Sequence, residues 1–163
     1  RGRAGPGGCK VSNQRISLES IAVRLRQQLA PSLGINRIGS SLDFDFLDAV
    51  GTAENWPGVW VGAQRSTPID DGRRFSGRMR QNVRVEIAVR VIVQRYVAAE
   101  ASQESLLNRI CDAVADALIG HQPTNAAEPL VWVQSQDGQP EQSVMTADLI
   151  FATTVSYERA ASA

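Results

Sequence analysis

A regular alternation of apolar and polar residues runs through positions 82–97. Apolar side chains occupy every second position over most of this stretch, and many of the positions between them are charged or polar. A two-residue period is typical of a β-strand with one buried face, and this stretch is long for a strand. We therefore expect one long strand from Asn82 to Val97, with its apolar face in the core. The apolar positions are Val83, Val85, Ile87, Val89, Val91 and Val93, and the other face carries Arg84, Glu86, Ala88, Arg90, Ile92 and Gln94.

Two other segments have the 3.6-residue apolar period of amphipathic helices. The first predicted helix covers residues 18–30, and Ser17 before it is suited to be its N-cap. The second covers residues 102–119, with Ser102 as its candidate cap. Gly120 follows it at the position where glycine commonly ends a helix.

Shorter apolar segments predict four more strands. Asp137-Gly138 lies between the last two of them and is a hairpin signal. Residues 42–50 fit either a strand or a short helix, and we favour the helix. The four strand segments are 35–39, 56–65, 130–135 and 143–158.

Residues 66–81 are predicted to be a loop, because they contain prolines, glycines and an Asp-Gly turn signal. This loop is longer than most connections between secondary-structure elements, and loops of such length tend to be functional or disordered. Basic residues interleaved with an aromatic residue can contact an acidic protein surface or DNA, or can simply be solvated. The residues concerned are Arg73, Arg74, Phe75, Arg78 and Arg80.

These elements predict an α+β fold. It would be a mostly antiparallel sheet of about four to five strands, with two main helices on one face and a long β-hairpin or loop arm. There is no internal repeat. We expect one domain at residues 16–159, between a flexible N-terminal arm at 1–15 and a C-terminal tail at 160–163.

The distribution of charge changes this picture more than the composition does. The 163 residues are 43% hydrophobic with zero net charge, as in an ordinary soluble domain, and no apolar run is long enough to span a membrane. Residues 64–95, however, carry eight arginines against three acids, and residues 96–163 carry two against nine. The two regions could meet within one molecule or between neighbouring copies.

The residues give no catalytic constellation. There is no phosphate-binding glycine motif and no metal-ligand spacing. His121 is the only histidine and fits a solvated turn residue, and Cys111 fits a small buried apolar residue. Three aspartates form a small cluster in which Asp45 and Asp48 would share one side of a helix and could hold a hard cation, although surface acids at a helix start are the simpler interpretation. Those aspartates are Asp43, Asp45 and Asp48. We predict no enzyme, no cofactor and no metal.

The length of the central strand has a geometric consequence. A strand of fifteen residues spans roughly 50 Å, whereas an 18-residue helix spans roughly 27 Å. The second helix cannot cover such a strand, so the strand either bends or projects past the body. The apolar face of a projecting strand must be shielded from water, and a neighbouring subunit is the obvious way to shield it.

The order of elements resembles that of the tail terminator, or tail completion, proteins of long-tailed bacteriophages. "ESIAVRLRQQL" is similar to the opening helix of that family, and "WPGVWVGAQ" to its first strand. "QNVRVEIAVRVIVQRY" is similar to its long strand, and "ESLLNRICDAVADALIGHQP" to the helix and turn that follow. "PLVWVQSQDG" and "ADLIFATTVSYER" are similar to its final hairpin. The resemblance covers residues 16–159.

The resemblance implies a non-enzymatic virion protein, assembled in the host bacterial cytoplasm. Its copies would form a ring, usually sixfold, on the last ring of the tail tube, and would meet the head-side connector while genomic DNA passes through the lumen. A head–tail stopper of the same virion, a small α+β ligand-binding protein and a nucleic-acid-binding protein are the alternatives. The expected interface residues are Arg73, Arg74, Phe75, Arg78, Arg80, Arg84, Glu86, Arg90, Arg95, Asp112 and Asp116.

Overall fold

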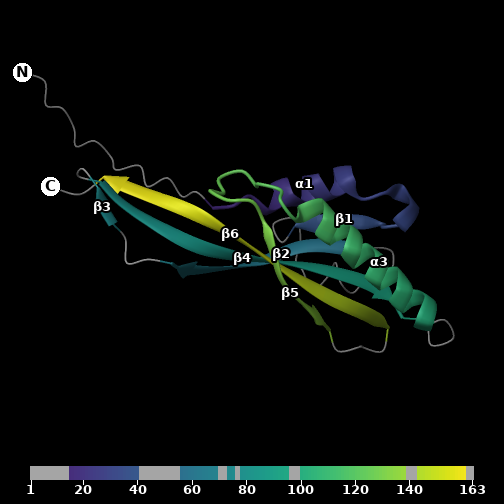
Figure 1. The fold of residues 1–163 in the computed structure, drawn as a ribbon. Helices are drawn as coiled ribbons and strands as arrows, with labels where there is room; N and C mark the ends of the chain where they lie inside the picture. The colour runs from purple at the N-terminus through teal and green to yellow at the C-terminus, as the bar shows by residue number, and fades with distance from the viewer. Residues whose placement is uncertain are drawn as a thin grey trace, which may run out of the picture.

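The computed structural model describes residues 15–40, 56–69, 73–75, 78–95, 100–138 and 143–160. Within them a twisted, mostly antiparallel sheet carries the two helices α1 and α3 on one face (Figure 1). The α+β class predicted from the sequence is confirmed. The predicted helix at 42–50 and its three aspartates lie outside the described residues.

The sheet has six strands in the order β1-β2-β4-β6-β5, and β3 pairs with β4 beside this path. The β1–β2 pair is parallel, and the other pairs are antiparallel. The sheet is larger than expected because β3 forms where the sequence predicted a loop. The strands are β1 (Arg37–Ser40), β2 (Gly58–Pro68), β3 (Arg73–Phe75), β4 (Arg78–Gln94), β5 (Val131–Asp137) and β6 (Val144–Ala160).

The prediction of a loop at 66–81 is wrong for much of that segment. β2 continues to Pro68, β3 forms within it, and β4 begins at Arg78 rather than at Asn82. The reason is β6, which extends to Ala160 and offers its backbone to the first residues of β4. These residues lack apolar alternation, so the sequence pattern shows no strand there.

The apolar face of β4 lies in the main core, as predicted. Its odd-numbered residues from 83 to 93 are all buried and cluster with the buried faces of both helices. The same face of β6 contributes Leu149, Phe151 and Val155. Thr153 interrupts that apolar series and is 4% exposed, but its hydroxyl donates to the backbone oxygen of Glu128 at 2.5 Å. A buried hydroxyl with such a partner is tolerated in a core.

Helix α1 (Leu18–Gln28) begins at the cap that the sequence predicts. The Ser17 side chain accepts a hydrogen bond from the Ser20 backbone N–H at 3.2 Å. This bond satisfies one of the N–H groups that a helix start leaves without a partner. A short 3-10 helix, Pro31–Leu33, follows and leads the chain towards β1.

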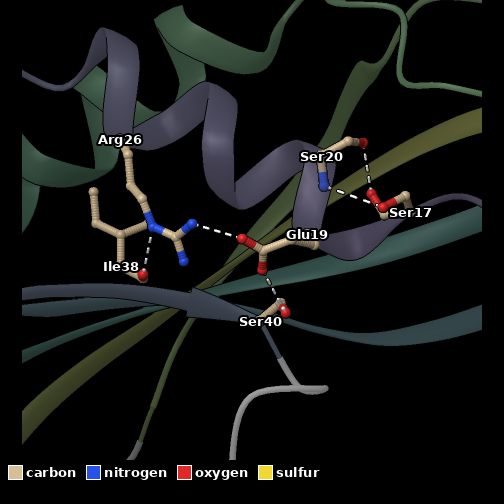
Figure 2. Close-up of polar contacts among 6 residues, drawn as sticks. All are labelled: Ser17, Glu19, Ser20, Arg26, Ile38 and Ser40. Carbon is tan, nitrogen blue, oxygen red and sulfur yellow. Dashed lines mark hydrogen bonds and ion pairs between the residues drawn. The ribbon is translucent and has the colours of Figure 1, made fainter.

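Polar contacts tie α1 to the edge strand β1 (Figure 2). The Glu19 carboxylate pairs with Arg26 at 2.6 Å and also accepts from the Ser40 hydroxyl at 3.1 Å. Arg26 in turn donates from Nε to the backbone oxygen of Ile38 at 3.0 Å. Both ends of β1 are thus held to the helix above them.

Helix α3 (Glu100–Leu118) begins before the predicted cap, so Ser102 lies within the helix and that assignment is wrong. The sequence around Ser102 is rich in good helix formers, which favours a helix that starts before it. The predicted end is confirmed, since Gly120 has φ 78°. The Arg24 side chain of α1 donates to the Ala117 carbonyl at 3.3 Å and satisfies one of the last carbonyls of α3.

One end of the sheet extends past both helices. The 17 residues of β4 span about 56 Å, and the 19 residues of α3 span about 28 Å. The far ends of β4 and β6, together with β3, lie beyond the helices in Figure 1. The predicted projection is therefore confirmed. We call this part the β arm and define it as β3, residues 78–82 and residues 156–160.

The core position Leu25 and the surface position Val23 on the same helix give a matched stability test. Leu25 is 0% exposed and Val23 is 38% exposed. We expect Leu25→Ala to lower the free energy of unfolding by about 3 kcal/mol, because it leaves a cavity. Val23→Ala should change it by less than about 0.5 kcal/mol. Urea unfolding followed by circular dichroism measures both, and equal effects would contradict the burial of α1 described above.

Candidate assembly interface

The charged face of β4 lies on the side of the sheet away from the helices. Arg84 is exposed there, and its Nε lies 3.3 Å from an oxygen of the half-buried Glu86. Glu86 also lies directly opposite Arg65 of β2 in the strand register, and Arg65 is exposed. Two cations thus flank one carboxylate, which leaves excess positive charge at the base of the β arm.

Arg90 on the same face has a partner within the chain. Its Nε and Nη2 donate to the two carboxylate oxygens of Asp148, each at 2.7 Å. The two residues lie opposite each other in the β4–β6 register. Two parallel charge-assisted bonds of this kind are the strongest arrangement for an arginine and a carboxylate. The charge of Arg90 is therefore largely neutralised inside one molecule.

The β arm brings together five arginines from three short segments of the sequence, and one of them, Arg159, lies opposite Met79. Arg73 and Arg74 belong to β3, and their register partners are Arg80 and Met79 of β4. Arg78 opposes Phe75 in the same pairing. Arg80 is exposed, and its Nη2 donates to the Ser156 hydroxyl at 3.2 Å.

Arg95 does not join that group. It follows the other end of β4, where its backbone N–H donates to the Ser143 carbonyl at 2.9 Å. The length of β4 separates it from Arg78 by about 56 Å. The predicted interface residues of the basic region therefore lie along a whole strand and do not form one patch.

The acidic candidates lie on α3, on the side of the sheet that carries the helices. Asp112 and Asp116 are both exposed and four residues apart, so they share one side of the helix. The pKa of the Cys111 thiol is raised to about 11, first by burial and then by the carboxylates of Asp112 and Asp137. Asp137, at the end of β5, therefore lies close to α3. Arg109, which is also exposed, lies three residues before Asp112 and so on the same side of the helix.

Strand β5 is a feature that the sequence analysis did not connect with an interface. All seven of its residues are exposed, although it begins with three apolar ones. Val131, Trp132 and Val133 are 55%, 51% and 36% exposed. Three adjacent apolar residues on a strand without alternation were the available signal, because such a strand has no simple buried face.

A groove of about 530 Å³ lies beside the start of β5. Its lining includes the exposed apolar side chains of Ile69, Ile119 and Val131, together with Arg84 and Glu128. It joins the base of the β arm to the β5 edge. An apolar floor between one cation and one anion suits a peptide segment better than a small charged ligand.

A family model described as phage tail terminator protein matches residues 11–162. The chain belongs to this family. It is therefore a structural protein of the virion tail. No curated protein matches the sequence.

Solved structures show the same fold as this tail terminator family member. A chain from the virion of a native gene transfer agent particle superposes with a TM-score of 0.56 at 17% sequence identity. The match covers 90% of this chain and 98% of that chain. Nearly the whole described architecture, including both long strands, is thus shared at low identity.

Two further candidates, His121 and Cys111, lie in the described part of the chain. The pKa of His121 is lowered, first by partial burial and then by the Arg24 guanidinium, so the ring is neutral at pH 7. The thiol of Cys111 is likewise protonated at neutral pH, because its pKa is about 11. In the part of the chain that the structure describes, no three acids, histidines or cysteines are placed to hold a metal, and no helix could cross a membrane.

The pairing of Arg90 with Asp148 can be measured by a double-mutant cycle with Arg90→Gln and Asp148→Asn. The side chains are 39% and 24% exposed, so solvent screens the pair, and we expect a coupling of about 1 kcal/mol. The cycle isolates this pair from other contacts that Arg90 makes. Urea unfolding of the four proteins gives the value.

The matched control is the pair Arg84 and Glu86, at 3.3 Å and with side chains 46% and 32% exposed. Its cycle, with Arg84→Gln and Glu86→Gln, should give less than about 0.5 kcal/mol. A coupling for Arg90 no larger than this control would contradict the neutralisation described above.

Proposed function

We propose that copies of this chain form a ring on the last ring of the tail tube, where they terminate tube polymerisation and join the tail to the head-side connector. The β arm carries the argument. It is a strand ribbon that extends past the helices of its own chain, and such a ribbon is best stabilised by a neighbouring molecule. Membership of the tail terminator family supports the same assignment.

The distribution of charge supports contacts between copies rather than within one. The β arm, taken together with Arg84 and Glu86 at its base, carries six arginines against the two acids Glu158 and Glu86, whereas α3 and the end of β5 carry exposed aspartates. Different surfaces of one chain that attract each other make head-to-tail contacts, and such contacts close into a ring when the rotation between copies allows it. The unit of assembly in this proposal is residues 16–159.

The partners follow from this position in the tail. They are further copies of the chain, most simply six, the tail tube protein, and the connector or stopper protein on the head side. Genomic DNA would pass through the lumen without sequence-specific binding. The zero net charge of the chain also disfavours strong electrostatic attraction to the phosphates. Assembly would take place in the cytoplasm of the host bacterium.

Removal of the gene tests the terminating role. We expect overlong tail tubes in electron micrographs, because nothing would stop the addition of tube subunits. The alternative is a head–tail stopper in the same virion, which would act after the tail is complete. Tails of normal length that fail to attach to heads would therefore contradict the proposal and favour a stopper.

A charge swap tests the contact between copies. Arg80→Glu with Arg84→Glu should lower the yield of rings at least about tenfold, because like charges would then face each other. Asp112→Arg with Asp116→Arg should do the same. Native mass spectrometry, or counting of rings on isolated tails, measures the yield.

Combining the two pairs of substitutions serves as the internal control, since it should restore much of the lost assembly. We leave Arg90 unchanged because its substitution would break the pair with Asp148. Assembly that is unaffected by either pair alone would refute the electrostatic contact.

A further inference from the structure

The exposed apolar residues of strand β5 are not explained by packing within the fold. This strand is the terminal strand in the sheet order, and β6 is its one partner among the described strands. A strand edge exposes backbone N–H and C=O groups that can pair with another strand. We infer that the β5 edge receives the β arm of a second copy. This inference rests on the proposed ring and names the surface through which neighbouring copies would meet.

The two edges of the sheet are built differently. The β1 edge has four residues, includes the charged Arg37, and is tied to α1 through Ile38 and Ser40 (Figure 2). A short, charged strand discourages pairing with other chains. The β5 edge has seven residues, and its charge is confined to Asp137 at the end. Of the two, β5 is the one suited to accept a strand.

The apolar residues of β5 face both sides of the sheet. Val131 lies opposite Ala152, on the face away from the helices. Trp132 lies opposite Phe151, which is buried in the core, so Trp132 is on the helix side. The register shifts between Trp132 and Gln134. An incoming strand would therefore find apolar contacts above and below its backbone, which is how strand addition gains specificity.

Charge identifies the occupant as the β arm. On the helix side, β5 itself ends in the exposed Asp137, which lies opposite Ala147, and Asp112 of α3 lies near it, since both carboxylates act on Cys111. The arm carries Arg80 in an exposed position, and its sequence "RRFSGRMR" alternates arginines with Phe75 and Met79. Cations with apolar residues between them match an apolar edge bordered by carboxylates.

A single chain cannot make this contact with its own arm. Residues 78–82 of the arm continue β4 and pair with residues 156–160 of β6. The same β6 pairs with β5 through residues 147–152, several residues further back along the strand. The tip of the arm and the β5 edge are thus fixed at different places along one rigid pairing. The partner must be a second copy.

The test places a photoreactive residue on the edge, by Trp132→p-benzoylphenylalanine in the full chain assembled into tails. We expect crosslinks between two copies, with the second site within residues 73–84 when mapped by mass spectrometry. Val23→p-benzoylphenylalanine is the control, because Val23 is also an exposed apolar residue but lies on α1. Its crosslinks to the arm should be at least about tenfold weaker.

A second variant, Trp132→Lys, reports on affinity. Because Trp132 is half-exposed, the variant should fold, and its thermal unfolding should match that of Val23→Lys. We expect the affinity between copies to fall at least about tenfold, as for loss of an aromatic anchor.

The outcomes separate this inference from the proposed function. Rings that form normally with Trp132→Lys would refute docking at the β5 edge and leave the terminator role intact. Crosslinks from position 132 to the tube protein, to the connector, or to another surface of a second copy would have the same meaning. If the unchanged protein forms no ring on tails, the proposed function fails and the docking inference fails with it.

Discussion

The structure depends on the pairing of β4 with β6. The two strands run antiparallel over 17 residues, from Arg78 opposite Ala160 to Gln94 opposite Val144, without a shift in register. Because successive side chains point to opposite faces, a slip of one residue would move every core side chain of one strand to the other face. The buried residues of β4 and β6 fix this register, and the register in turn fixes where the charged face points.

The β arm follows from a mismatch in length within that pairing. Helices α1 and α3 cover the part of the sheet where the alternation of apolar residues is strong, and the pairing continues beyond them. In the uncovered part the backbone hydrogen bonds remain, but the regular alternation of apolar residues stops. Arginines are compatible with that situation, since they lose little by staying in water. A ribbon of this kind is only marginally stable alone, which is a physical reason for it to bind a neighbour.

The sequence predicted those elements whose signal is local. The helix at Leu18, its Ser17 cap and the turn at Gly120 were confirmed, because each depends on residues a few positions apart. The strand nature of residues 78–81 was missed, since it depends on β6, about eighty residues later. The ion pair of Arg90 with Asp148 was missed for the same reason, because the two residues are 58 positions apart in the sequence. The interface residues expected from the sequence remain predictions.

Which charged side chains are paired within the chain indicates which of them are available to a partner. The excess of arginine in residues 64–95 is reduced inside the molecule at Arg90, whose partner Asp148 comes from the acidic region. The base of the arm is balanced only in part, because Glu86 lies between two arginines. The arginines at the tip of the arm lie beyond both helices, whereas Asp112 and Asp116 lie on α3 itself, so the two groups are kept apart within one chain. A protein with zero net charge that keeps its two signs at separate surfaces is suited to bind copies of itself.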